Sequence, residues 1–114
     1  MKLKKPLRLN VKRADSYLAI KNRLKTAEVR LLRGCIKSIK KDDMIYLAHG
    51  GDKVTIYVDK LKKFGSIEEM LENNLVKMAS GGSRKKLDVK FYEQFYRADE
   101  IERHEVVVIF FRLG

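Results

Sequence analysis

The sequence predicts an α+β fold in which a curled, mostly antiparallel, barrel-like sheet of five or six strands is flanked by helices. Several short segments alternate apolar and polar residues, which is typical of half-buried strands. Other segments carry apolar residues at three- and four-residue spacing, which indicates helices of unequal length. The expected order is strand, helix, three strands, two helices and a last strand. This order favours a curled sheet over a doubly wound parallel one.

The N-terminal part of the chain supplies the first two expected strands and one helix. Apolar and polar side chains alternate over Pro6–Val11, which predicts a strand. Asp15 is a favourable N-cap, and a helix is expected over Ser16–Arg23, where apolar residues share one face. The next strand is expected over Thr26–Leu32, and Gly34 ends it.

A hairpin is expected in the middle of the chain. A basic linker, Cys35–Lys41, leads into it. Strands over Met44–Ala48 and Lys53–Lys60 flank the turn His49–Asp52, whose paired glycines can supply the positive φ that a tight turn needs.

The C-terminal part is expected to hold two helices, a loop and the last strand. Ser66–Glu69 has the Ser-x-x-Glu spacing of a capping box, so a helix is expected from there to about residue 73. Met78–Ser83 is glycine-rich and is expected to form a flexible loop. An amphipathic helix is expected over Arg84–Tyr96, and the β-prone run Glu105–Arg112 predicts a closing strand.

The composition points to an anionic partner. The 114 residues include 26 Lys and Arg against 15 Asp and Glu, a formal net charge of +11. A polyanion such as RNA gains free energy by releasing counterions to such a surface, and long-range attraction raises the encounter rate. The alternative is that the cations only form a well-solvated surface.

Length and residue types exclude other classes. The length fits one domain, residues 1–114. The longest uncharged apolar run, Val106–Phe111, is too short to cross a membrane. Cys35 is the only cysteine and the chain has two histidines, so we expect no disulfide, metal or cofactor. A cytoplasmic protein is therefore expected.

A resemblance to a known family begins at Arg23–Arg30. This segment is similar to the signature Gly-x-Lys-x-x-Glu-x-Arg of the ASCH family. Lys25, Glu28 and Arg30 match the signature, and Arg23 replaces its glycine.

Three further segments resemble the same family in the same order. Ile39–Tyr46 is similar to the family's Ile-Lys-x-Gly-Asp-x-Ile-x-Phe, with Asp42 in place of the glycine. Phe64–Leu71 resembles the helix start Tyr-x-Ser-Phe-x-Glu-x-Leu, and the apolar, Phe-containing last strand matches the family's ending.

The resemblance implies a PUA-like barrel with a cleft at one side, into which the signature Lys, Glu and Arg project. Many ASCH domains are thought to bind RNA. A related branch consists of amidohydrolases that remove the acetyl group from N4-acetylcytidine. Those enzymes share the signature Lys and Arg but carry a catalytic Thr where this chain has Glu28.

The candidate ligand-binding residues are Lys25, Thr26, Glu28 and Arg30. Side chains two apart on a strand share a face, so Glu28 and Arg30 can sit side by side with Lys25 at the strand entrance. Arg30 could fork two hydrogen bonds to phosphate or a base edge, and Glu28 could accept from an exocyclic amine. If the protein is an enzyme, Lys25 and Glu28 are the candidate catalytic residues. The alternative is an exposed ion pair on a strand.

A basic rim next to the signature is the candidate phosphate-binding surface. It comprises Lys21, Arg23, Arg33, Lys37, Lys40 and Lys41.

Aromatic side chains near the C-terminal part allow two interpretations. Tyr92, Phe95 and Tyr96 could stack on bases, but helical spacing favours a core position for Phe91 and Phe95.

Three functions therefore remain: an RNA- or nucleotide-binding module, which we favour, a small hydrolase of acylated nucleosides such as N4-acetylcytidine, and a protein-interaction adaptor. The expected partner is RNA or a nucleotide-like ligand, with no membrane involved.

Overall fold

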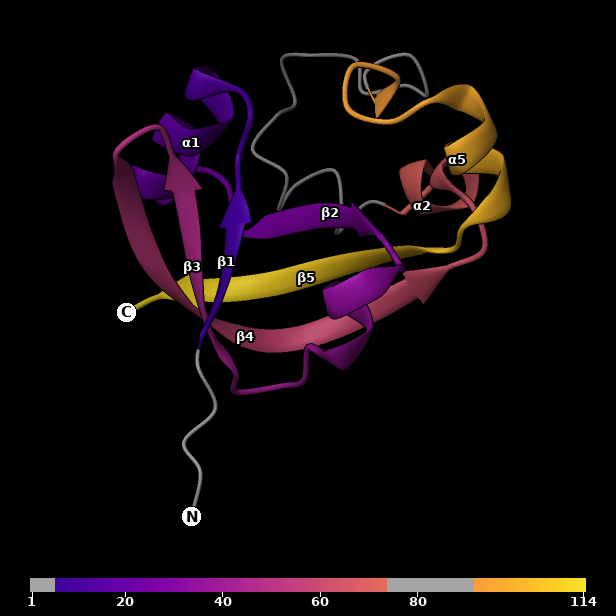
Figure 1. Ribbon diagram of the computed structural model, residues 1–114. Helices are drawn as coiled ribbons and strands as arrows, with labels where there is room; N and C mark the ends of the chain where they lie inside the picture. The colour runs from indigo at the N-terminus through magenta and orange to yellow at the C-terminus, as the bar shows by residue number, and fades with distance from the viewer. Residues whose placement is uncertain (1–5, 74–91) are drawn as a thin grey trace.

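A computed structural model gives the fold, and it describes residues 6–73 and 92–114 (Figure 1). The elements are β1 (Leu7–Asn10), α1 (Ala14–Lys21), β2 (Ala27–Leu31), the 3-10 helix η1 (Gly34–Ser38), β3 (Met44–His49), β4 (Asp52–Phe64), α2 (Ile67–Leu71), α5 (Ala98–Arg103) and β5 (Val106–Leu113). None of the helices in this part of the chain is both long and apolar enough to cross a membrane.

The five strands form one curled sheet, a half-barrel, in the order β1-β3-β4-β5-β2. β1 pairs with β3 in parallel, and the other three pairings are antiparallel. β1 and β2 are therefore the two edges of the sheet. The predicted α+β fold, with a curled and mostly antiparallel sheet of five strands, is confirmed.

The curl of the sheet depends on β4. This strand is 13 residues long and pairs with β3 through its first half and with β5 through its second. A register shift between Val58 and Lys60 leaves Asp59 as the extra residue of a bulge. Such a bulge bends a strand and increases its twist. The sequence predicted an end at Lys60, but β4 continues to Phe64.

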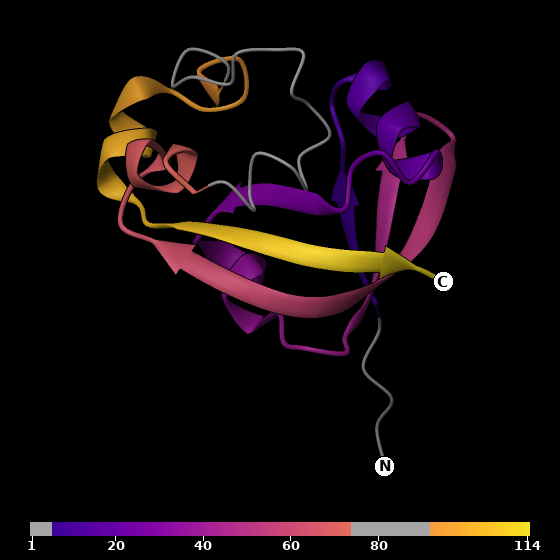
Figure 2. The same ribbon diagram turned by 180° about the vertical axis from the view of Figure 1, so that it is seen from behind.

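Both faces of β5 are buried, each in a different core. Ile109 and Phe111 face an inner core with β1, β3 and α1, inside the half-barrel. Val108 and Phe110 face a second core on the other side of the sheet, formed with α2 and residues 92–96. Figures 1 and 2 show α1 at one end of the sheet and α2 and α5 at the other. This double burial explains the unbroken apolar run of the last strand.

The predicted hairpin is confirmed. His49 pairs with Asp52, so Gly50 and Gly51 form a two-residue turn, in which Gly50 takes a φ of +59°. The segment Cys35–Lys41 was expected to be a basic linker. In the structure, the 3-10 helix η1 occupies its first half.

Helix α1 begins two residues before the predicted start. Arg13, in extended conformation, is its N-cap, and Asp15 lies in the first turn. The Asp15 carboxylate accepts two hydrogen bonds from the Arg13 guanidinium, at 2.8 and 2.9 Å, and one from the Ser16 N–H at 2.8 Å. A carboxylate in this first turn favours the helix through its attraction to the positive end of the helix dipole.

The end of α1 is a Schellman motif. Asn22 is the C-cap; the Arg23 N–H donates to the Ile20 carbonyl at 3.1 Å, and the Leu24 N–H donates to the Ala19 carbonyl at 2.9 Å. This pattern needs a left-handed residue after the cap, and here Arg23 has a φ of +62°. The motif turns the chain directly into the signature segment.

Helix α2 has half of the predicted capping box. Ser66 Oγ accepts from the Glu69 N–H at 3.1 Å, but the Glu69 carboxylate accepts from the Gly65 N–H at 3.0 Å and not from that of Ser66. The helix ends at Leu71, two residues earlier than expected.

The C-terminal third differs most from expectation. The predicted loop Met78–Ser83 and most of the predicted helix Arg84–Tyr96 lie outside the described residues, and residues 93–96 form turns and a bend. Helix α5, whose first turn holds Asp99 and Glu100, was not predicted. The predicted last strand is confirmed as β5.

The left-handed Arg23 generates a stability prediction. Arg23 and Asp42, at φ +62° and +71°, stand where the ASCH motifs that this sequence resembles carry glycine. A side chain in this conformation is strained, whereas glycine adopts it freely. We expect Arg23→Gly to raise the free energy of unfolding by about 0.5–1 kcal/mol in urea titrations, and Asp42→Gly to raise it less, since Asp tolerates the conformation better.

The control is Asn22→Gly, one residue earlier, where φ is −87° and glycine only gains freedom in the unfolded chain. That variant should be less stable. If Arg23→Gly loses as much stability as Asn22→Gly, the left-handed residue is not strained.

Candidate functional site

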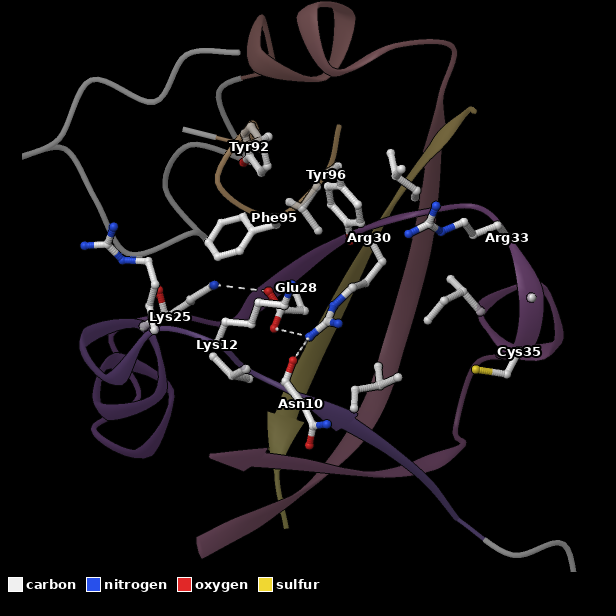
Figure 3. A pocket seen from close by; sticks show the side chains of 18 residues that line it. Asn10, Lys12, Lys25, Glu28, Arg30, Arg33, Cys35, Tyr92, Phe95 and Tyr96 are labelled. Atoms are coloured by element: carbon white, nitrogen blue, oxygen red, sulfur yellow. Dashed lines mark hydrogen bonds and ion pairs between the residues drawn. The ribbon is translucent and has the colours of Figure 1, made fainter. Parts of the chain in front are cut away.

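A cavity of about 580 Å³ opens between the two edges of the sheet. Its described walls come from the end of β1 and the start of α1, from β2, from the start of η1, and from residues 92–96 (Figure 3). The volume is in the range of cavities that hold small ligands.

Three of the predicted ligand-binding residues lie together in this cavity. Glu28 on β2 is 7% exposed. Its Oε1 lies 3.2 Å from Lys25 Nζ and its Oε2 lies 3.3 Å from an Arg30 guanidinium nitrogen. Figure 3 shows both cationic side chains converging on the carboxylate. The arrangement is a partly buried cluster of two cations and one anion, not an exposed strand pair.

Arg30 also connects the two sheet edges. The guanidinium nitrogen that contacts Glu28 donates a 2.8 Å hydrogen bond to the Asn10 carbonyl on β1. Asn10 was not among the predicted site residues, because no sequence pattern indicates that the first strand faces the second across the seam of the half-barrel.

The Glu28 carboxylate is ionised at neutral pH. Burial alone would raise the pKa of Glu28, but the charges of Lys25 and Arg30 and their hydrogen bonds outweigh burial and hold this pKa below its usual range. The group therefore acts as a fixed hydrogen-bond acceptor and is a weak base.

An aromatic wall faces this cluster. Tyr92 is buried, while Phe95 and Tyr96 are half-buried, and all three line the cavity. Burial, and then the charge of Glu28, raise the pKa of Tyr92, so its hydroxyl stays protonated. Among the described residues Phe95 belongs to neither core, so its predicted core position is not confirmed; Phe91 lies outside the described residues.

Two arginines from different elements contact residues 94–100. Arg33, after β2, forms an ion pair with Glu100, and its guanidinium lies 5.3 Å from the centre of the Tyr96 ring. Arg13, before α1, donates to the Gln94 side chain at 2.8 Å. Both arginines line the cavity.

The predicted phosphate-binding residues are dispersed. Arg33 lines the cavity, whereas Lys21 pairs with Asp52 at 2.9 Å and Arg23 is exposed after α1. The remaining three are exposed and do not line the cavity. They are Lys37, Lys40 and Lys41. Lys12 joins Arg33 and Arg13 in the lining. It was not predicted, because it follows β1 and lies far from the signature in sequence.

Thr26 is exposed, precedes β2 and does not line the cavity. Its carbonyl accepts from the Phe111 N–H at 3.0 Å, which ties the start of β2 to β5. Cys35 lines the cavity as a free, exposed thiol. Among the described residues, no group of three His, Cys, Asp or Glu side chains is arranged to hold a metal ion.

Comparison with known proteins identifies the fold through solved structures. No family model and no curated protein sequence matches the chain. Among solved structures, a mutant form of ZmASCH from Zymomonas mobilis superposes with a TM-score of 0.58 at 10% identity, over 92% of this chain and 66% of that one. The chain has an ASCH-like fold.

Two more structures share this ASCH-like fold across nearly their whole length. The hypothetical protein PH0355 matches with a TM-score of 0.77 at 23% identity, over 96% of this chain and 100% of that one. Protein PF0455 from Pyrococcus furiosus matches with a TM-score of 0.67 at 24% identity, over 96% and 97%. The PUA-like half-barrel implied by the sequence motifs is thus confirmed.

The low pKa of Glu28 generates a prediction about acid stability. Because this pKa is lower in the folded than in the unfolded chain, the ionised group stabilises the fold above about pH 4.5. That contribution is lost as the pH falls through the folded-state value. At pH 7, Glu28→Gln should lower the free energy of unfolding by about 2–4 kcal/mol, since it strands two partly buried cations.

Urea titrations of both proteins from pH 7 to pH 3 should show this difference shrinking as the pH falls. Glu102→Gln, on the exposed side of α5, is the control and should change little at any pH. A difference that stays constant with pH would contradict the assignment of the charge to Glu28.

Proposed function

We propose that this protein binds RNA or a nucleotide-like ligand, with one nucleotide-sized unit entering the cavity between β1 and β2. The observation that carries the proposal is the ionised Glu28, held by Lys25 and Arg30 inside a cavity of about 580 Å³. A buried charge cluster that faces a cavity is a common feature of functional sites.

The cluster offers hydrogen bonds of both kinds to a base. Among the described residues, each Glu28 oxygen has one cationic partner and retains accepting capacity, so it can take a hydrogen bond from an exocyclic amine. The Lys25 ammonium has further donors for a carbonyl oxygen of the same base. Cytosine, whose Watson–Crick edge carries an amine and a carbonyl on either side of N3, fits this pair of functions.

The aromatic side chains and the cations that line the cavity suit the ring faces and the phosphate of a nucleotide. Phe95 and Tyr96 can stack on a base, which single-stranded nucleic acids permit because their bases are unstacked. Lys12, Arg13 and Arg33 surround the same space and can contact a phosphate. The ASCH-like fold supports this assignment, since RNA binding is the function expected of that fold.

Hydrolysis is the less favoured use of the same site. The nucleoside amidohydrolases that the sequence resembles need a threonine hydroxyl at position 28, and here the position holds a carboxylate. Two neighbouring cations keep its pKa low, which makes it a poor general base. Thr26 cannot replace that hydroxyl from its exposed position outside the cavity.

The binding proposal predicts two separable effects on RNA affinity. Charge reversal of Lys37, Lys40 and Lys41 should weaken single-stranded RNAs of all sequences about equally and reduce the salt dependence. Glu28→Gln should instead weaken cytidine-containing ligands by about 10- to 100-fold, because a charged acceptor is lost, and should alter the order of preference among the four bases. Arg30→Ala should alter this order in the same way.

Fluorescence polarisation with labelled homopolymers, at several salt concentrations, measures both effects. Circular dichroism of each variant checks that it is folded. Salt-independent binding, or losses from Glu28→Gln and from the triple lysine variant that are equally non-selective, would rule out a nucleotide-reading cavity.

A second prediction concerns catalysis. The wild-type protein should release negligible cytidine from N4-acetylcytidine, because Glu28 supplies neither a hydroxyl nor an effective base. Glu28→Thr is the variant in which deacetylation could appear. Chromatographic measurement of cytidine decides the matter: efficient turnover by the wild type that Lys25→Ala abolishes would overturn the binding-only assignment.

A further inference from the structure

The outer face of the half-barrel carries a second group of aromatic and cationic side chains. At the end of the sheet formed by β1, β3 and the first half of β4, Ile45, Leu47 and Ile56 point into the inner core. Their neighbours along each strand therefore point outward. We call the outward set the tyrosine face. It comprises Arg8, Tyr46, Lys53, Tyr57 and Arg112.

The two tyrosines are diagonal neighbours on adjacent antiparallel strands. Tyr46 of β3 pairs with Thr55 of β4, and Tyr57 of β4 pairs with Met44. Diagonal positions in such a pair are about 7–8 Å apart, which long side chains bridge. Both rings are half-buried, so part of each remains accessible. Sheets that present aromatic rings in this way stack two or three unstacked bases of single-stranded RNA.

A cation lies over one face of each ring, and a base that stacks on that face takes its place. Lys53 Nζ lies 4.2 Å from the centre of the Tyr46 ring, and the Arg112 guanidinium carbon lies 5.6 Å from that of Tyr57. Arg8 pairs with Tyr46 in the β1–β3 register. Lys53 and Arg8 are exposed, so each can turn from its present position to a phosphate at low cost. Arg112 is exposed as well, but it must share its guanidinium between a phosphate and Asp59.

The carboxylate on this face is already paired. Asp59 forms an ion pair with Arg112, so the excess of positive charge on this face comes from Arg8 and Lys53. This charge complements a polyanion. An acidic peptide would meet the cations equally well but would not use two flat rings, and a duplex would keep its bases stacked away from them.

A shallow hollow adjoins Tyr57. It measures about 420 Å³, and Met44, Thr55, Leu113 and Gly114 are in its wall. The edge of a planar base lying on the Tyr57 ring would extend over this largely apolar hollow, where it loses contact with water.

The tyrosine face and the cavity share the edge strand β1. Asn10, whose carbonyl accepts a hydrogen bond from Arg30 in the cavity, lies two residues after Arg8, and Arg8 is next to Tyr46. A single strand that passes from the cavity over this edge of the sheet therefore meets Arg8 first, then Tyr46, and then Tyr57 on the next strand.

We infer that the tyrosine face is a second binding surface for single-stranded RNA, on which bases stack on Tyr46 and Tyr57 while Arg8, Lys53 and Arg112 contact phosphates. The inference rests on the proposed function in one respect, that the ligand of the cavity is RNA. It adds a length requirement: a mononucleotide reaches only the cavity, whereas an oligonucleotide reaches both surfaces.

The test compares an eight-nucleotide single-stranded RNA, a hairpin duplex of equal charge and cytidine monophosphate. We expect the double variant Tyr46→Leu, Tyr57→Leu to bind the single strand roughly 20- to 100-fold more weakly, as stacking on two rings implies. It should bind cytidine monophosphate and the duplex within about twofold of the wild type. Tyr46→Phe with Tyr57→Phe keeps both rings and should retain wild-type affinity.

A lysine pair on β4 provides the matched charge control. Lys53→Gln removes a cation from the tyrosine face, and Lys63→Gln removes an exposed cation from the same strand beyond the bulge. The first should weaken the single strand several-fold more than the second. Unfolding midpoints in urea establish that all variants are folded.

Each outcome is decisive. Less than a twofold loss from the leucine variant, with mononucleotide binding intact, overturns the tyrosine face and leaves the cavity in place. If the leucine variant loses affinity equally for the single strand and the duplex, the loss comes from a change in fold or charge and not from stacking. That result would also overturn the tyrosine face. Absence of mononucleotide binding together with a selective single-strand loss would support the tyrosine face while contradicting the proposed cavity function.

Discussion

The structure depends on the contact that Arg30 makes in two directions, to the Glu28 carboxylate and to the Asn10 carbonyl. The sheet is open between β1 and β2, so side chains connect these edges where a closed barrel would use backbone hydrogen bonds. Strands in direct contact lie about 5 Å apart and leave no space for a ligand. The open seam gives both the cavity and the need for a charged bridge across it. A buried carboxylate with two cations is tolerated because each charge is partnered.

The second organising feature is β5, which belongs to two cores. Its inner face fixes the half-barrel, and its outer face holds α2 and the turn at residues 92–96. That turn carries Tyr92, Phe95 and Tyr96 to the cavity, opposite Glu28. The aromatic wall is therefore positioned by packing that is independent of the charged cluster. At the other end, where the outer face has no such cover among the described residues, Tyr46 and Tyr57 remain accessible.

Local patterns predicted most of the fold, and the cluster at Lys25, Glu28 and Arg30, because strand alternation and motif spacing are short-range properties. What failed depended on long-range contacts. The role of Asn10 follows from the meeting of two strands that are far apart in sequence, and the position of Phe95 follows from a turn where helical periodicity indicated a core helix. Helix α5 was missed because its six residues hold too few apolar positions to show a period, although Asp99 and Glu100 mark its first turn.

The ion pair between Arg33 and Glu100 affects how much of the net charge of +11 is available to attract an anionic ligand. A phosphate that takes Arg33 displaces the Glu100 carboxylate, which then attracts a cation of its own. In the proposed complex, a counterion that leaves the RNA would thereby be taken up by the protein, and the exchange would yield little entropy of release. Arginines that hold an internal carboxylate would thus act as nearly salt-insensitive contacts that favour ligands by geometry, and the exposed lysines would supply the salt-sensitive attraction. The effective charge of the protein toward such a ligand would then be smaller than its formal charge, which would limit indiscriminate binding to other polyanions.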